Sequence, residues 1–469
     1  MRVPYLIVLA DSRAPDVVIA GGGIAAAATA IRLRALGLRV GLLVRPTAPV
    51  HGVEAIPRRA LDLFDVLGEP DVATEAAAVD VDGPAHVWHG AAGRVPAPFV
   101  HVDRLALAAV LLSRAVMRGA TVERVRRLPR PEDIPGNPVG VVDATGRAAA
   151  WSRPVVGRGG PVAWLFRAPP EDDMAGRVVR ADDWWAYRLG HTAATWLGVV
   201  PASGPLTPAM FDTAAERLGL SPASLVAQGR RPAGVQRAAE VVSGRRIAVG
   251  DAALAHDPIA GQGIRFALGS AIAAATTLVT WAGDPTRRDI ATRYYRDLVA
   301  AEDRRHLATL GRLAEADPPE PGRVPAIVKI GATVVEVPLS VDGHVALGPA
   351  LRLPDGTVTR WAGTFDLLHL ARITTEPTPR LLVVAQLLAL GLDPPAARAL
   401  VGWAVGNGVV VDAGPAPALA AGVVCELDDR CGSSTHKERF AGSGVVGAPD
   451  GKRRSGAGSP SGRQSGFLH

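Results

Sequence analysis

The segment from residue 16 to residue 45 constrains the fold of this chain more than any other. Its first five residues, Asp-Val-Val-Ile-Ala, predict a buried strand, and three consecutive glycines from Gly21 to Gly23 predict a tight turn. An alanine-rich stretch then predicts a helix over 24–36, and residues 39–44 predict a second strand. A strand, a turn, a helix and a strand in this order are typical of the βαβ unit. We therefore predict an α/β fold with a parallel sheet.

The turn itself reads Gly21-Gly22-Gly23-Ile24-Ala25-Ala26, a G-x-G-x-x-A variant of the dinucleotide-binding fingerprint. The first glycine makes the turn from strand to helix. The second, Gly23, lets the backbone approach a pyrophosphate, whose charge the helix N-terminus stabilises. Ala26 takes the place of the third glycine and adds one methyl group at the contact between helix and strand. We predict that Gly21, Gly23 and Ala26 bind a nucleotide cofactor.

The end of the second strand departs from this pattern. An acidic residue usually stands there and binds the adenosine ribose, whereas this chain has Val44 followed by Arg45. Arg45 can stack on an adenine or meet a phosphate instead, so we include it among the cofactor residues. The alternative is a degraded Rossmann unit that binds no nucleotide, and the fingerprint alone leaves that alternative open.

Two further motifs follow in the expected order. They are Val-Val-Asp-Ala-Thr-Gly-Arg at 141–147 and Gly-Asp-Ala-Ala-Leu-Ala-His-Asp-Pro at 250–258, and the second continues through 259–263 into a predicted long helix over 263–281. With the fingerprint, they resemble the flavoprotein monooxygenases of the para-hydroxybenzoate hydroxylase fold over roughly residues 16–315. The resemblance implies FAD as cofactor, oxygen as co-substrate, and a reduced nicotinamide or an external reductase as electron donor.

The resemblance also assigns roles at the flavin. Asp251 would hydrogen-bond the ribityl chain, Pro258 would lie beside the isoalloxazine, and Arg104 would meet the flavin side of the cofactor. The Gly261 and Gly263 amides would face the pyrimidine edge of the ring at a helix N-terminus, which suits an electron-rich ring. The full predicted cofactor set is Gly21, Gly23, Ala26, Arg45, Arg104, Asp143, Thr145, Gly146, Gly250, Asp251, Pro258, Gly261, Gln262 and Gly263.

Lysine content separates branches of this fold. Flavin-dependent halogenases need a lysine in their N-terminal half, and this chain has three lysines, none before Lys329. Their Trp-x-Trp-x-Ile-Pro segment is also absent, the nearest stretch being 184–189. Phenol-type hydroxylases carry an Asp-Gly motif that helps to bind NADPH, and Asp-Ala-Thr-Gly at 143–146 stands in that place. The sequence therefore disfavours halogenation and an in-built nicotinamide site.

The chain most resembles the flavoproteins that mature tryptophylquinone enzymes, which oxygenate a protein-bound tryptophan. The shared features are Trp184, Trp185 and Tyr187, the stretch Gly-Val-Glu-Ala-Ile-Pro at 52–57, and the 250–258 motif. On a strand, Trp185 and Tyr187 share one face and Trp184 lies on the other. Aromatic walls suit an aromatic substrate, which makes these three residues our substrate candidates, with core packing as the alternative.

Three residues are candidates for acid–base catalysis. His256 and Asp257 precede the residue expected at the flavin edge, and Glu54 follows a strand near the expected flavin face. Each has a plainer explanation. His256 can be a packed core residue, Asp257 can cap the following turn, and Glu54 can belong to a surface salt bridge.

The resemblance and the order of the predicted elements imply a Rossmann-type FAD-binding domain with an interleaved β-rich substrate domain, plus a small C-terminal α+β module that is winged-helix-like. A hairpin is expected at 341–361, and the Pro/Gly-rich linker is 318–325. The module would dock a peptide partner, or it would only cap the fold or dimerise. The expected boundaries are 14–150 and 241–317 for the FAD-binding domain, 151–240 for the substrate domain, 326–412 for the module and 413–469 for a disordered tail.

Composition narrows the classes that remain. The 48% hydrophobic content excludes wholesale disorder, and the only cysteines, Cys425 and Cys431, exclude a disulfide scaffold and a cysteine-bound metal in the body. His86 and His89 lack a third ligand, so we expect no metal. We expect neither a nucleic-acid-binding groove nor a membrane span. We interpret residues 1–10 as a short extension and expect a cytoplasmic protein. The alternative function is a non-oxygenating reductase of the geranylgeranyl reductase branch, or a catalytically silent binding protein.

Overall fold

The computed structural model describes residues 14–46, 52–88, 91–94, 98–153, 155–157, 159–314, 325, 327–363 and 365–414. Its contacts divide the chain into two compact units. Unit 1 holds the described residues within 1–322 and 333–368, and unit 2 holds those within 323–332 and 369–464. Several predictions fall outside the described residues: the N-terminal extension, nearly all of the linker at 318–325, His89, both cysteines, and the predicted tail from residue 415 onward.

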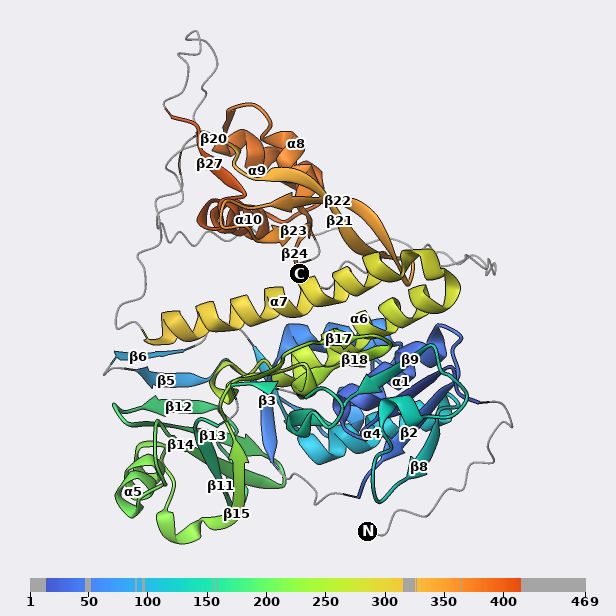
Figure 1. Cartoon of the computed structure of the whole chain (residues 1–469). Helices are drawn as coiled ribbons and strands as arrows, with labels where there is room; N and C mark the ends of the chain where they lie inside the picture. Colours follow the sequence, from blue (N-terminus) through green and yellow to red (C-terminus); the bar gives the residue numbers. More distant parts are fainter. Residues whose placement is uncertain are drawn as a thin grey trace, which may run out of the picture. The chain divides into compact units, whose positions relative to one another are not determined.

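Unit 1 contains a six-stranded sheet (Figure 1). β1 (Val17–Ala20) is buried on both faces, as expected of an apolar strand in a parallel sheet. It pairs in parallel with β2 and β9, so that Ala20 stands beside both Leu43 and Asp143. The strand order is β17 (Val242–Ser243), β18 (Arg246–Ala248), β9 (Gly140–Asp143), β1, β2 (Val40–Val44) and β8 (Thr121–Arg124), with only β17 antiparallel to its neighbour.

Helices cover this sheet as the βαβ prediction requires. α1 (Ile24–Ala35) packs against α4 (Arg104–Met117) and α6 (Gly263–Gly283), and α6 packs against α7 (Arg288–Ala314). By length and composition α6 could cross a membrane, but 89% of its apolar window is buried inside the protein. The core helix of a globular unit meets the same test, and α6 lies in the main hydrophobic core.

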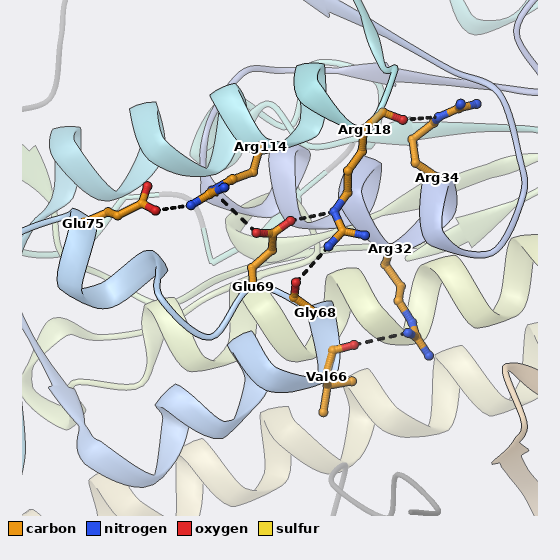
Figure 2. A network of polar contacts seen from close by, with 8 residues as sticks. All are labelled: Arg32, Arg34, Val66, Gly68, Glu69, Glu75, Arg114 and Arg118. Carbon is orange, nitrogen blue, oxygen red and sulfur yellow. Dashed lines mark hydrogen bonds and ion pairs between the residues drawn. The ribbon is translucent and has the colours of Figure 1, made fainter. Parts of the chain in front are cut away.

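A charge network holds α1 and α4 together through two short helices, α2 (Asp62–Leu67) and α3 (Val72–Glu75). Glu69 belongs to the loop between α2 and α3. In Figure 2 it lies beside Arg114 on α4 and Arg118, the residue that follows α4. Its carboxylate lies 2.6 Å from Nε of Arg118 and 3.5 Å from Nε of Arg114. From α1, Arg34 donates to the Arg118 carbonyl at 2.9 Å and Arg32 donates to the Val66 carbonyl at 3.1 Å. These contacts fix the helix that follows the glycine turn.

The β-rich region of unit 1 is a seven-stranded sheet whose antiparallel centre lies within the expected substrate domain (Figure 1). Two of its strands come from before that domain, because β5 pairs in parallel with β12 and brings β6 with it. α5 (Pro208–Arg217) packs on one face of the sheet. The order is β15 (Val226–Pro232), β11 (Val162–Ala168), β14 (Ala194–Pro201), β13 (Trp184–His191), β12 (Arg177–Arg180), β5 (Ala85–Trp88) and β6 (Ala91–Arg94).

Two small sheets join these regions within unit 1. One has the order β3 (Val53–Pro57), β7 (Phe99–Asp103), β4 (Val79–Val81), and both β3 and β7 contact β13 of the seven-stranded sheet. The other has the order β10 (Val155–Val156), β16 (Gln236–Ala238), β19 (Leu254–Ala255). The stretch at 52–57 therefore contacts the seven-stranded sheet, and the motif at 250–258 pairs through β19 with β16.

The expected hairpin begins earlier than predicted and belongs to unit 1. It consists of β21 (Thr333–Val341) and β22 (His344–Arg352), which turn at Asp342 and Gly343 and continue to β23 (Val358–Thr359). Val345 is fully buried in the main core, and its N–H donates to the hydroxyl of Thr280 on α6 at 2.9 Å. This packing separates the hairpin from the expected module at 326–412. Two short strands follow, β24 (Trp361–Ala362) and β25 (Phe365–Asp366).

Unit 2 contains the predicted small helices. Its described strands form a sheet with the order β26 (Thr378–Pro379), β20 (Ile327–Ile330), β27 (Val410–Asp412). Its helices are α9 (Arg380–Ala389), α10 (Pro394–Gly406) and the part of α8 (Leu367–Ile373) from His369 onward. Three helices and a short three-stranded sheet agree with a small α+β module, and they do not confirm a winged-helix fold.

Candidate functional site

The three predicted motifs meet at one edge of the six-stranded sheet. They follow β1, β9 and β18, three neighbouring parallel strands whose carboxyl ends lie together. Backbone hydrogen bonds join their ends, from Ala144 N–H to the Ala20 carbonyl and from Val249 N–H to the Asp143 carbonyl, both at 2.9 Å. Ligands of open α/β sheets bind at this edge. The sequence pattern and the topology therefore indicate the same place.

The glycine turn has the shape that a pyrophosphate needs. Gly21 has φ of +129°, and a side chain there would come within 2.3 Å of the Ala144 carbonyl oxygen, so only glycine fits. A side-chain carbon added at Gly23 would meet no described atom within 4 Å. No side chain of the described residues caps the N-terminus of α1. The first amides of the helix thus have no side-chain cap among the described residues, and such amides can bind an anion.

The end of β2 is apolar, as the sequence indicated. A Cβ added at Gly22 would lie 2.9 Å from a methyl group of Val44, so Val44 packs on the turn in the place of the usual ribose acid. Arg45 is exposed just beyond it. Ala26 is fully buried, which accounts for the small residue at this contact.

The second motif forms a turn that its own side chains stabilise. The buried Asp143 carboxylate accepts hydrogen bonds from Thr145 N–H at 3.1 Å, Thr145 Oγ1 at 2.6 Å and Trp151 N–H at 2.7 Å. The Thr145 hydroxyl in turn accepts from Ala150 N–H at 2.8 Å. These side chains, predicted to bind the cofactor, are thus engaged in the turn. Gly146 faces open space, with no described atom within 4 Å of an added Cβ.

The third motif lies against the first two. Gly250 has φ of +56°, and a Cβ there would lie 2.8 Å from the Cβ of Ala25 on α1. The Asp251 carboxylate is partly exposed and lies 3.9 Å from Nε of Arg147. Arg147 also donates to the carbonyls of Gly234 at 2.5 Å and His256 at 2.8 Å. Asp251 is therefore placed beside both of the other turns and has a cation as its neighbour.

The segment after the third motif forms a short 3₁₀ turn (Pro258–Ala260) before α6 begins. Asp257 caps this turn by accepting Ile259 N–H at 3.0 Å, which is the alternative role weighed for it. Burial raises the pKa of Asp257, although the Ile259 N–H and Arg147 oppose the shift. Gln262 accepts from Nε of Arg265 at 2.5 Å. A Cβ added at Gly263 would meet open space, as at Gly23.

Glu54 belongs to a half-buried ion-pair cluster rather than to a surface salt bridge. Its Oε1 lies 2.5 Å from Arg104, the first residue of α4, and 3.8 Å from Nη1 of Arg231 on β15. Burial opposes its ionisation, but Arg104, Arg231 and Arg147 outweigh burial and lower the Glu54 pKa. Arg104 is also influenced by the charge of Asp251, which places this cluster beside the third motif.

The aromatic candidates divide between two faces of β13, as strand alternation requires. Trp184 packs in the core beneath α5 and is 5% exposed, so the structure makes it a core residue. Trp185 and Tyr187 share the other face, with ring centroids 5.6 Å apart. Tyr187 lies over Gly198 of the paired strand β14 and near Glu54, and burial together with Glu54 raises its pKa to about 12.

The candidate set from sequence omitted several residues that the fold brings to this place. Arg147 follows directly after the second motif, so its position was the available signal. Arg231 lies on β15, in a strand whose residues are otherwise mostly exposed and carry no motif. Glu302 and His306 come from α7 and approach His256. His256 is only 4% exposed, which agrees with the alternative that it is a packed core residue.

The turns and charges fit FAD. Open space lies over Gly23, Gly146 and Gly263, at the three places where the motifs predict the cofactor to approach the backbone. An uncapped helix N-terminus suits the pyrophosphate, and Asp251 and Arg104 offer polar groups of both signs. No group of three metal-binding side chains occurs among the described residues.

Comparison with solved structures identifies proteins of the same fold. The peptidyl tryptophan dihydroxylase QhpG, essential for tryptophylquinone cofactor biogenesis, is 22% identical with a TM-score of 0.56, covering 84% of this chain and 99% of its own. The flavin-dependent halogenase CmlS is 15% identical with a TM-score of 0.61, covering 86% and 96%. The flavin-dependent brominase Bmp2, as a triple mutant, is 19% identical with a TM-score of 0.55, covering 64% and 89%.

No protein-family model matches the chain, and no curated protein matches its sequence. At these identities the structural likeness establishes the fold. The fold predicted from the three motifs is confirmed, since flavin-dependent halogenases and a tryptophylquinone-related dihydroxylase both have it.

Proposed function

We propose that this chain is an FAD-dependent oxygenase that hydroxylates an electron-rich aromatic substrate. The observation that carries the proposal is the meeting of three motif turns at one sheet edge, with open space over Gly23, Gly146 and Gly263. Beside it stand the Glu54–Arg104 pair and the aromatic face of Trp185 and Tyr187.

A peptidyl tryptophan during maturation of a quinone cofactor is the substrate that we propose first. QhpG has this fold and is a peptidyl tryptophan dihydroxylase. Indole is electron-rich, so its hydroxylation does not require a strong base from the protein. A small aromatic substrate would use the same aromatic face. The location that we propose with this function is cytoplasmic.

We also propose the residues that would hold FAD. The amides at the start of α1 would receive the pyrophosphate, and Asp251 would bind the ribityl chain. The backbone of 258–263 would line the ring, and Arg104 would approach its other side. When bound and reduced, the flavin would supply the oxygen-transfer chemistry together with oxygen, with electrons from a reduced nicotinamide or an external reductase.

The chain's own residues would position the substrate and manage protons. Trp185 and Tyr187 would stack on the aromatic ring. Asp257 is the best candidate to hold a proton near the reaction, because burial raises its pKa. Glu54 stays ionised and keeps Arg104 in place, so we propose for it a positioning role.

Halogenation is the competing chemistry, because CmlS and Bmp2 have the same fold. The absence of any lysine before Lys329 disfavours it. Incubating the reduced flavoprotein with an aromatic substrate, oxygen and bromide distinguishes the two. A hydroxylated product supports the proposal, whereas a brominated product overturns it.

Flavin binding tests the proposal most directly. We expect the purified chain to be yellow or to bind added FAD, and we expect Gly23→Ala to weaken binding by at least about tenfold, because the added methyl group occupies the pyrophosphate approach. Gly311→Ala on α7 is the matched control, since a Cβ there also meets open space but lies outside the motif turns. If the chain gains no flavin signal even at high FAD concentration, the proposal is wrong and a catalytically silent binding protein is favoured.

Catalysis separates the remaining alternatives. Oxygen uptake coupled to a hydroxylated product supports the oxygenase. Reduction of an isoprenoid double bond under anaerobic conditions, without oxygen uptake, would instead identify a reductase of the geranylgeranyl reductase branch.

A further inference from the structure

A second cluster of buried ionisable groups lies behind the 256–258 segment, in unit 1. Its centre is Glu302 on α7, whose side chain is 6% exposed. The Glu302 carboxylate pairs with Arg265 on α6 and lies 2.5 Å from Arg305, one turn along α7. Nε2 of His256 lies 3.2 Å from the same carboxylate. The cluster therefore joins α6, α7 and the third motif.

His306, on the next turn of α7, reaches the backbone of the motif. Its Nε2 accepts the Asp257 N–H at 3.1 Å. A backbone N–H can only donate, so Nε2 carries no proton and the ring is neutral with its proton on Nδ1. Burial, reinforced by His256, lowers the His306 pKa to about 4 and preserves this neutral form. The two imidazoles stand edge to face, with centroids 4.5 Å apart.

The other side of the same peptide unit is held by Arg147. Its Nη2 donates to the His256 carbonyl at 2.8 Å, while His306 binds the N–H of the following residue. The carbonyl and the N–H of one peptide point to opposite sides, so the two side chains grip the 256–257 peptide from both. Arg147 is itself fixed by the Gly234 carbonyl and by Gln236, which donates to the Arg147 carbonyl at 2.9 Å.

The orientation of this peptide sets the course of the residues after it. Asp257 caps the 3₁₀ turn (Pro258–Ala260), and the chain then passes to the start of α6. A rotation of the 256–257 peptide would move the Asp257 carboxyl and the amides that lead into Gly263. Both belong to the surface where the proposed function places the flavin ring.

We propose that His306 and Arg147 form a clamp on the 256–257 peptide, and that they are positioning residues which set the Asp257 carboxyl and the 258–263 backbone against the cofactor. The inference rests on the proposed function for its catalytic consequence. The clamp itself is a property of the chain without cofactor.

Hydrogen exchange in the apo chain tests the clamp independently of flavin. We expect the Asp257 amide to exchange at least about tenfold faster in His306→Phe than in the natural chain, because its acceptor is lost. His306→Gln should restore slow exchange, since the Gln Oε1 can replace Nε2 as acceptor. Unchanged exchange in His306→Phe, or equally fast exchange in His306→Gln, would overturn the clamp.

The holoprotein tests the consequence. We expect His306→Phe and Arg147→Gln to shift the bound flavin absorbance and to lower kcat more than they raise KM, with His306→Gln close to the natural chain in both. Melting temperatures show whether a variant is only less stable. A natural chain that binds no FAD refutes the proposed function, whereas flavin spectra and kcat that are indifferent to both substitutions, in a chain that binds FAD, refute this inference alone.

Discussion

Two carboxylates of unit 1 are each held by two arginines, yet their surroundings differ. Glu69 lies in the network of Figure 2, where Arg114 and Arg118 stand one turn apart on the same stretch of α4. Glu54 lies on β3, and its partners come from the start of α4 and from β15. The Glu69 side chain is 9% exposed, whereas that of Glu54 is 27% exposed.

The difference indicates what each cluster does. Glu69 ties the loop between α2 and α3 to α4, against which α3 packs, so packing of these helices is enough to explain its contacts. Glu54 joins the nucleotide-binding part to the β-rich sheet, beside Tyr187 and the third motif. A partly exposed charge cluster at a junction of sheets, next to open backbone turns, is where a ligand would bind.

Replacing Glu69 should have the largest effect on stability. Glu69→Gln removes the buried counter-charge of Arg118 and one of the two carboxylate partners of Arg114, which keeps Glu75. Because both arginines are partly exposed, we expect a loss of about 2 kcal/mol, the size of a charged hydrogen bond. Urea unfolding measures the loss. Flavin bound per folded molecule should be unchanged, and a selective loss of flavin binding without loss of stability would contradict the structural role.

Replacing Glu54 should lower activity more than stability, the reverse of what we expect for Glu69. Glu54→Gln frees Arg104 and Arg231, so we expect kcat/KM for the aromatic substrate to fall by up to about 100-fold through misplacement of groups at the site. The free energy of unfolding should fall less than in Glu69→Gln. The comparison between the two clusters would fail if Glu54→Gln lost stability and kept its activity.

A third carboxylate with two arginines, Glu302, extends the comparison to acid conditions. Burial opposes its ionisation, but His256, Arg265 and Arg305 outweigh it and lower the Glu302 pKa to about 2. A lowered folded pKa contributes stability that is present above pH 4.5 and is lost as the pH falls toward about 2. Glu302→Gln should therefore flatten the fall in unfolding free energy over this window. An unchanged slope would show that Glu302 is not a source of acid lability.

Much of the nucleotide-binding half could be predicted from sequence, because its signals are local. The 16–45 segment, the strand before Asp143 and the 250–263 motif each carry their glycines and apolar residues in one stretch. The structure adds that the Asp143 carboxylate stabilises its own turn, since a fully buried acid must find hydrogen-bond donors nearby.

The features that could not be predicted depend on pairing between distant segments. Arg231 reaches Glu54 because β15 pairs with β11. Most residues of β15 are exposed, so nothing in its sequence indicates a site residue. The hairpin beginning at Thr333 was expected in the C-terminal module, but burial of Val345 in the main core decides its place. The clamp on the 256–257 peptide likewise depends on distant segments. Arg147 lies 109 positions from His256, and His306 lies 49 positions from Asp257, and no sequence period reveals these contacts.

The smallest effect that we predict concerns the Tyr187 phenol, which senses the charge of Glu54. Burial is the main cause of its pKa of about 12, and Glu54 adds to it. Glu54→Gln should therefore lower the Tyr187 pKa slightly, whereas Glu69→Gln should leave it unchanged, as measured by ultraviolet titration against a Tyr187→Phe control. Since the phenol stays neutral well beyond pH 10, Tyr187→Phe should also leave the pH profile of activity unaltered. A changed profile would show instead that the phenol takes part in proton transfer.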